Sequence, residues 1–152
     1  MDHHRAALDA AKEFLEFVRS SEKPTLRGLA MRLDNLATLM WPLNTWIFEE
    51  GIPERDWHTD VRDWSAIAET RFPDLERETI QQPRNISSVV DIAEICVDIE
   101  ESMVVESLSD EKQAAQHLCW KYWHHFGLHV RDVQLHLYML MSEDVFWDDS
   151  SE

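Results

Sequence analysis

Residues 111–141 read EKQAAQHLCWKYWHHFGLHVRDVQLHLYMLM, and this stretch decides the fold. Its apolar residues recur every three or four positions, which is the spacing of one face of an α-helix. They are Ala115, Leu118, Cys119, Tyr122, Trp123, Phe126, Val130, Val133, Leu137 and Leu140. A glycine inside a helix costs about 1 kcal/mol relative to alanine, so Gly127 can mark a kink or a close helix contact. We predict one long helix or two successive helices here.

Four earlier segments carry the same helical spacing, at about residues 2–19, 26–40, 55–71 and 88–106. Side chains that cap helices stand before several of them, with Asp2 before the first and Thr25 before the second. Prolines lie between the segments, where they end helices. The sequence therefore predicts an all-α fold, a single-domain bundle of about five helices over residues 1–141. Residues 142–152 are expected to form an acidic, frayed tail.

Composition bounds the class of protein and its partners. Of the 152 residues, 44% are hydrophobic and 29% are charged, which is typical of a globular chain. The formal net charge of −16 argues against nucleic acid and anionic membranes as partners, because both would be repelled. A protein partner, basic or of mixed charge, stays compatible. Cys96 and Cys119 lack Cys-x-x-Cys spacing, and neither a signal peptide nor an apolar span is expected, so we predict a cytoplasmic protein.

Five of the eight histidines fall between His117 and His136. On a helical wheel, one column at the edge of the core contains His125, His129, Asp132 and His136. A helix rises about 1.5 Å per residue, so the two ends of this column lie roughly 16 Å apart and cannot share one ion. A metal would use His125, His129 and Asp132, or His129, Asp132 and His136. His117 and His124 lie off the column and are expected to be exposed.

The segment at 88–106 carries an acidic column of its own, formed by Asp91, Glu94, Asp98 and Glu101. Glu94 or Asp98 could complete a set of ligands for a divalent transition metal, provided that three side chains converge within about 4–5 Å. The Glu-x-x-His pairs of di-metal bundles are absent. The common catalytic motifs are absent too, which argues against an enzyme. Ordinary hydrogen bonding of His125 and His129 to backbone or to facing acids is the favoured interpretation, and no cofactor is expected.

Trp46 and Trp147 fall on no apolar stripe, which makes them candidates for anchoring a partner. The sequence favours a non-enzymatic interaction or regulatory domain with an acidic surface. A metal-binding bundle that uses His125, His129 and Asp132 is the first alternative. An acidic decoy or inhibitor that mimics the charge of nucleic acid is the second. The pattern does not indicate an oligomeric state.

Two motifs in the second half of the chain carry a resemblance. They are Asp91-Ile92-Ala93-Glu94-Ile95, followed by Asp98-Ile99, and His125-Phe126-Gly127-Leu128-His129-Val130. The chain resembles an uncharacterised bacterial helical family, a domain of unknown function whose closing helix carries His-Trp-Gly-x-His-Ala. Phe126 stands in place of the tryptophan and Val130 in place of the alanine, and both keep apolar character. The resemblance implies an all-helical cytoplasmic domain and supplies no activity or ligand.

Overall fold

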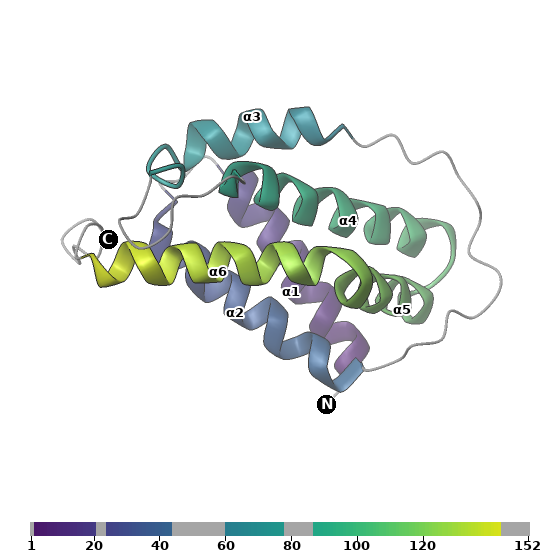
Figure 1. The fold of residues 1–152 in the computed structure, drawn as a ribbon. Coiled ribbons are helices and arrows are strands. Elements are labelled where there is room, and N and C mark those ends of the chain that lie inside the picture. The colour runs from purple at the N-terminus through teal and green to yellow at the C-terminus, as the bar shows by residue number, and fades with distance from the viewer. Residues whose placement is uncertain (1, 21–23, 44–59, 78–86, 144–152) are drawn as a thin grey trace.

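The structure, a computed structural model, describes residues 2–20, 24–43, 60–77 and 87–143. Within these ranges the regular elements are all helical and pack around one core, which confirms the all-α bundle (Figure 1). In chain order they are α1 (His3–Arg19), α2 (Leu26–Met40), η1 (Trp41–Leu43), α3 (Val61–Arg71), α4 (Ser88–Leu108), α5 (Glu111–Lys121), η2 (Tyr122–Phe126) and α6 (Gly127–Ser142). Trp46, Trp147 and nearly all of the predicted tail lie outside the described residues.

Five of the helices begin at a side chain that caps them. In each case an oxygen of the capping residue accepts a hydrogen bond from a backbone N–H of the first turn, a group that has no partner inside the helix. The caps are Asp2, Thr25, Asp60, Ser87 and Asp110. The predicted start of the third helix near residue 55 is wrong, because Asp60 is extended and caps a helix that begins at Val61.

The helix α4 lies at the centre of the bundle. It packs against α1, α3, α5 and α6, and Figure 1 shows it between α3 and α6. Apolar side chains such as Ile92, Ile95 and Ile99 are fully buried on different sides of it. A helix that is covered around most of its circumference must also bury the polar residues that its sequence contains. The acidic column of α4 is therefore drawn into the interior.

The run from residue 111 to residue 142 stays helical but changes its winding in the middle. The element η2 is a π turn, in which the Gly127 N–H donates to the Tyr122 carbonyl oxygen, five residues earlier. A β-carbon on Gly127 would lie only 2.4 Å from that oxygen. The chain at Gly127 is thus neither simply kinked nor broken, because the π turn leads directly into α6. Gly127 is the residue that lets α5 pass into α6 through a wider turn.

No helix in the described ranges combines the length and the apolar character needed to cross a membrane.

Candidate metal centre

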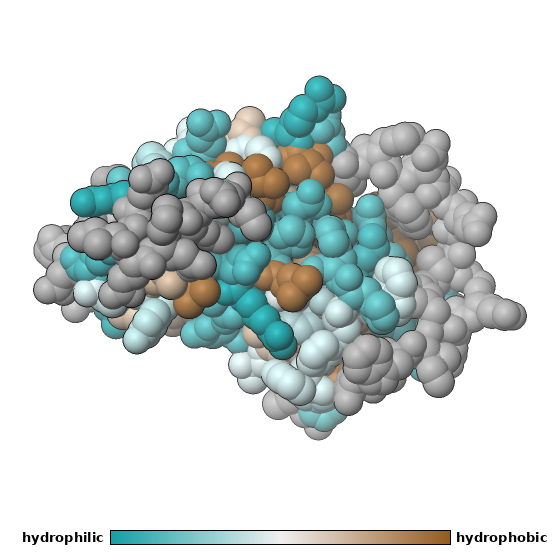
Figure 2. Space-filling view, in the orientation of Figure 1, coloured by the Kyte–Doolittle hydropathy of each residue, from teal (hydrophilic) through white to brown (hydrophobic). Residues whose placement is uncertain are grey.

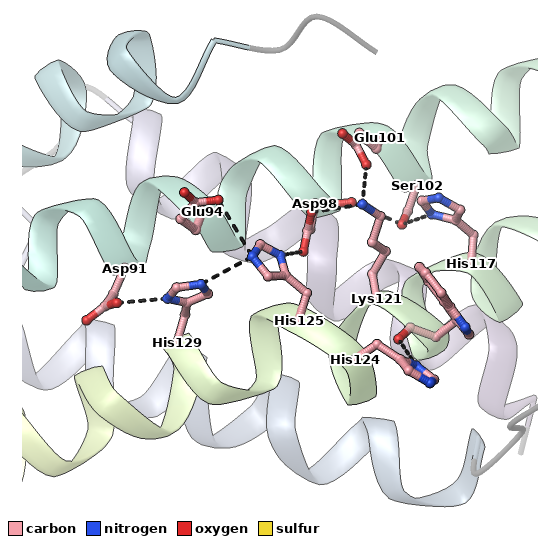
Figure 3. Close-up of polar contacts among 11 residues, drawn as sticks. Asp91, Glu94, Asp98, Glu101, Ser102, His117, Lys121, His124, His125 and His129 are labelled. Atoms are coloured by element: carbon pink, nitrogen blue, oxygen red, sulfur yellow. Dashed lines mark hydrogen bonds and ion pairs between the residues drawn. The ribbon is translucent and has the colours of Figure 1, made fainter. Parts of the chain in front are cut away.

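The acidic column of α4 is mostly buried. Asp91 is 1% exposed, Asp98 is 2% exposed and Glu101 is 9% exposed. Charged carboxylates in such positions need partners, because removing them from water is costly. Figure 3 shows that the partners come from the run that includes α5, η2 and α6.

The partners on that run are Lys121, His125 and His129, spaced four residues apart. Four residues of an α-helix turn about 400°, so such a series drifts by about 40° at every step. A π turn holds more residues than an α turn and counters this drift. The turn η2 lies between Lys121 and His129, and it helps to keep all three side chains directed at α4. The local winding that Gly127 permits therefore aligns the site.

Each imidazole is held from behind by an aspartate. The Nδ1 of His129 lies 2.8 Å from Asp91 Oδ1, and the Nδ1 of His125 lies 2.5 Å from Asp98 Oδ2. An ionised carboxylate can only accept, so Nδ1 is the donor in both bonds. A neutral ring that carries its proton on Nδ1 has a free lone pair on Nε2. The two aspartates thus select the tautomer that can bind a metal through Nε2.

The Nε2 atoms of the two rings face each other at 3.4 Å (Figure 3). Glu94 Oε2 lies 3.9 Å from His125 Nε2, and one ligand atom from each of the three residues falls within 4.8 Å of the others. Two ligands that are each about 2.0–2.1 Å from a tetrahedral zinc ion lie about 3.3–3.4 Å apart. The spacing of the two nitrogens therefore fits a shared ion, and Glu94 is close enough to supply a third ligand.

A proton can take the same place between the rings. Both Nε2 atoms cannot carry hydrogen at this separation, because two donors would then face each other. The hydrogen bond to Asp91 outweighs the effect of burial and raises the pKa of His129, with further contributions from the charges of Asp91, Glu94 and Asp132. A second proton on His129 would sit on its Nε2 and be donated to the Nε2 of His125. Protonation of His129 and metal binding exclude each other.

Lys121 neutralises the far end of the acidic column. Its Nζ lies 2.8 Å from Glu101 Oε2 and 3.3 Å from Asp98 Oδ1. Burial lowers the pKa of Lys121, but hydrogen bonds and charges from Glu101 and Asp98 raise it overall, so the ammonium form is retained. Asp98 is shared, with one oxygen bonded to His125 and the other to Lys121. This sharing holds its carboxylate in one orientation.

The prediction that His117 is exposed is wrong. Its ring is buried, with Nδ1 2.8 Å from Ser102 Oγ, and burial together with the charge of Lys121 lowers its pKa to about 4. A uniform helical wheel drawn from His125 misplaces it, because the π turn changes the phase between α5 and α6. His124 is exposed, as predicted, and its Nδ1 contacts the Trp120 carbonyl of its own helix.

The predicted histidine column is divided by the structure. His125 and His129 meet Glu94, while Asp98 lies behind His125 on the side of Nδ1. Asp132 adds its charge to the surroundings of His129 but does not belong to the three-residue group. His136 is buried, and its Nε2 contacts the Leu75 carbonyl oxygen at 2.7 Å.

Asp91, which anchors the His129 ring, is the residue of this cluster that the predicted ligand sets omitted. The signal that could have found it was its place in the acidic column, one turn before Glu94.

The chain matches no protein-family model, no curated protein and no solved structure.

Proposed function

We propose that this protein binds one divalent transition metal ion through the Nε2 atoms of His125 and His129 and the carboxylate of Glu94. The observation that carries the proposal is the 3.4 Å separation of the two Nε2 atoms, with both Nδ1 atoms bonded to buried aspartates. Metal-ligating histidines characteristically donate their other N–H to a carboxylate, which orients the ring and raises its basicity. Imidazole and carboxylate ligands suit zinc and its neighbours in the first transition row.

The local charge favours a dication. The four carboxylates of the acidic column and the ammonium of Lys121 leave a formal charge of −3 when both imidazoles are neutral. Water screens such an imbalance poorly in a partly buried site. A divalent ion between the two rings would reduce it and would satisfy both Nε2 lone pairs.

Metal content and titration test the proposal directly. The purified chain is stripped with a chelator and titrated with Zn²⁺ or Co²⁺ in a calorimeter, and we expect one ion per chain. His125→Ala removes a ligand and should abolish this binding. His124→Ala is the matched control, because His124 is the adjacent exposed histidine and bonds within its own helix. Equal binding by both variants, or no binding by the parent chain, would refute the proposal.

Protein binding is the second candidate function, and a distribution of exposed apolar residues supports it. Eight large hydrophobic side chains are exposed in the described ranges, and two of them lie on α4. The other six lie on α2, η1 and α6: Met31, Trp41, Leu128, Leu135, Tyr138 and Met141. Figure 2 shows separate apolar patches between polar residues on the face that it presents.

A paired pull-down tests this candidate. Leu128→Ser with Leu135→Ser should release a partner that the parent chain retains, whereas Val90→Ser on α4 should not. Retention of the same partner by the double variant would contradict binding through α6.

In this proposal the protein is cytoplasmic, in keeping with two buried free thiols, Cys96 and Cys119. Cell fractionation checks that location.

A further inference from the structure

The candidate metal centre is covered on one side and open on the other. The two aspartates behind the rings, Asp91 and Asp98, are buried. The side chains that would bind the ion are 44% exposed for His125, 27% for Glu94 and 24% for His129. An ion held by these three groups would therefore lie at the solvent boundary of α4 and α6.

The described part of the chain offers three ligands to this ion and no fourth. The group of metal-ligating side chains within reach of one another consists of Glu94, His125 and His129. Zinc sites with four protein ligands are structural, whereas sites with three keep a position for water or another ligand. With these three described residues as its protein ligands, an ion at this centre would have such an open position on its solvent side.

Charge decides which ligand fits the open position. A dication changes the formal charge of the centre from −3 to −1, so the site stays negative when it is loaded. Lys121 is directed at Glu101 and Asp98 and does not offer its ammonium to an incoming ligand. The chain as a whole carries −16. An anion is opposed by these charges, and a neutral donor is not.

We propose that the open position takes a neutral nitrogen donor of the imidazole class in preference to an anion. This inference rests on the proposed metal-binding function and adds the class of exogenous ligand. The step is a ligand exchange, in which an imidazole nitrogen replaces a water molecule on the ion. No oxidation state changes, and the water leaves as water.

The test uses the Co²⁺-loaded chain, because the visible spectrum of cobalt reports its coordination. Imidazole and sodium azide are titrated separately at constant ionic strength. We expect a saturable change with imidazole and a change with azide only at about tenfold higher concentration. Gel filtration after the imidazole titration must recover the cobalt with the protein. Loss of the cobalt at the concentration that changes the spectrum would overturn the inference.

A charge variant separates electrostatic selection from shape. Glu101→Gln removes one negative charge beyond the ligands and should strengthen azide binding severalfold without changing that of imidazole. Glu13→Gln is the matched control, since Glu13 is an exposed residue of α1 that pairs with Arg32. It should leave both titrations unchanged.

The remaining outcomes are also decisive. Azide binding as tightly as imidazole would overturn the selectivity. A spectrum that neither ligand changes would show a closed coordination sphere and overturn the inference, while stoichiometric cobalt would leave the proposed function intact. Failure of cobalt to bind at all would instead refute the proposed function.

Discussion

His125 and His129 face each other through their Nε2 atoms at 3.4 Å, and each ring is anchored at Nδ1 by a different aspartate of α4. The two anchoring aspartates are seven residues apart on α4. The two histidines are four residues apart on the facing helical run, His125 in η2 and His129 in α6. Neither ring can turn away without breaking a bond to a buried carboxylate. The pair is therefore held in place before any ion arrives.

Loss of an anchoring charge should weaken metal binding although no ligand is removed. Asp98→Asn and Asp91→Asn each keep an oxygen that can accept from Nδ1, but they lose the negative charge that raises the basicity of the ring. We expect Zn²⁺ affinity to fall by about 10–100-fold, measured by competition with a chelator. Asp132→Asn removes a nearby charge without removing an anchor and should cost much less. An equal loss in all three variants would indicate a general charge effect instead.

Gly127→Ala should destabilise the protein. In an ordinary α-helix this change would stabilise by about 1 kcal/mol, because alanine is the better helix former. Here the new methyl group meets the Tyr122 carbonyl at 2.4 Å, so the π turn must open, and we expect a net loss of about 1–3 kcal/mol in chemical denaturation. Metal affinity should fall as well, because His125 and His129 would lose their common direction.

The other glycine of the described helices provides the comparison. At Gly28 a β-carbon would meet the Phe17 ring and the Thr25 hydroxyl at 3.0 Å, a less severe overlap than the 2.4 Å at Gly127. Gly28→Ala should therefore cost less than Gly127→Ala and should leave metal affinity unchanged. A larger cost at Gly28 would contradict the role assigned to the π turn.

His117 should make the native state less stable in mild acid. Its pKa is about 4 in the folded chain and near 6.5 when the chain is unfolded, so only the unfolded state takes up a proton between these values. The free energy of unfolding is thus fully maintained above pH 6.5 and falls as the pH drops towards 4, by up to about 3 kcal/mol. His117→Asn should flatten this part of the stability profile relative to the parent chain. His124→Asn, an exposed histidine, should not, and identical profiles for both variants would contradict the prediction.

Metal binding should weaken on acidification and should release a proton. Because the pKa of His129 is raised, the ion must displace a proton from this ring at any pH below that value. In that range the affinity should fall about tenfold for each unit of pH. Calorimetry in buffers of different ionisation enthalpy measures the proton released. Binding without proton release near pH 6 would show that the proton and the ion do not compete.

The fold could be predicted from the sequence because its signals are local. Helical periodicity and the capping residues Asp2 and Thr25 specify helices without knowledge of their neighbours. The i, i+4 relation of His125 and His129 is equally local, so the sequence could predict that these two side chains share one face of a helix. The acidic column indicated Glu94 and Asp98 as possible partners for the same reason.

The rest depends on which helices touch and on how they are wound. Asp91 meets His129 because α4 packs against α6 in one particular register, which periodicity does not encode. The helical wheel places His136 in the same column. However, α4 begins at Ser88, only three residues before Asp91, and His136 contacts the turn after α3 instead of α4. The helical wheel gives the wrong position for His117 because it assumes a uniform α-helix. The wider π turn changes the angular position of every residue of α5 relative to α6.

All the groups of the centre, from Asp91 to His129, belong to one helical hairpin made by α4, α5, η2 and the start of α6. The helices α1, α2 and α3 bury that hairpin but contribute none of its donors. The centre is therefore portable in principle. Residues 87–130 could be transplanted into another bundle whose remaining helices present a matching apolar surface. The hairpin would keep the arrangement of these side chains, and the sequence of the other helices of the host could differ.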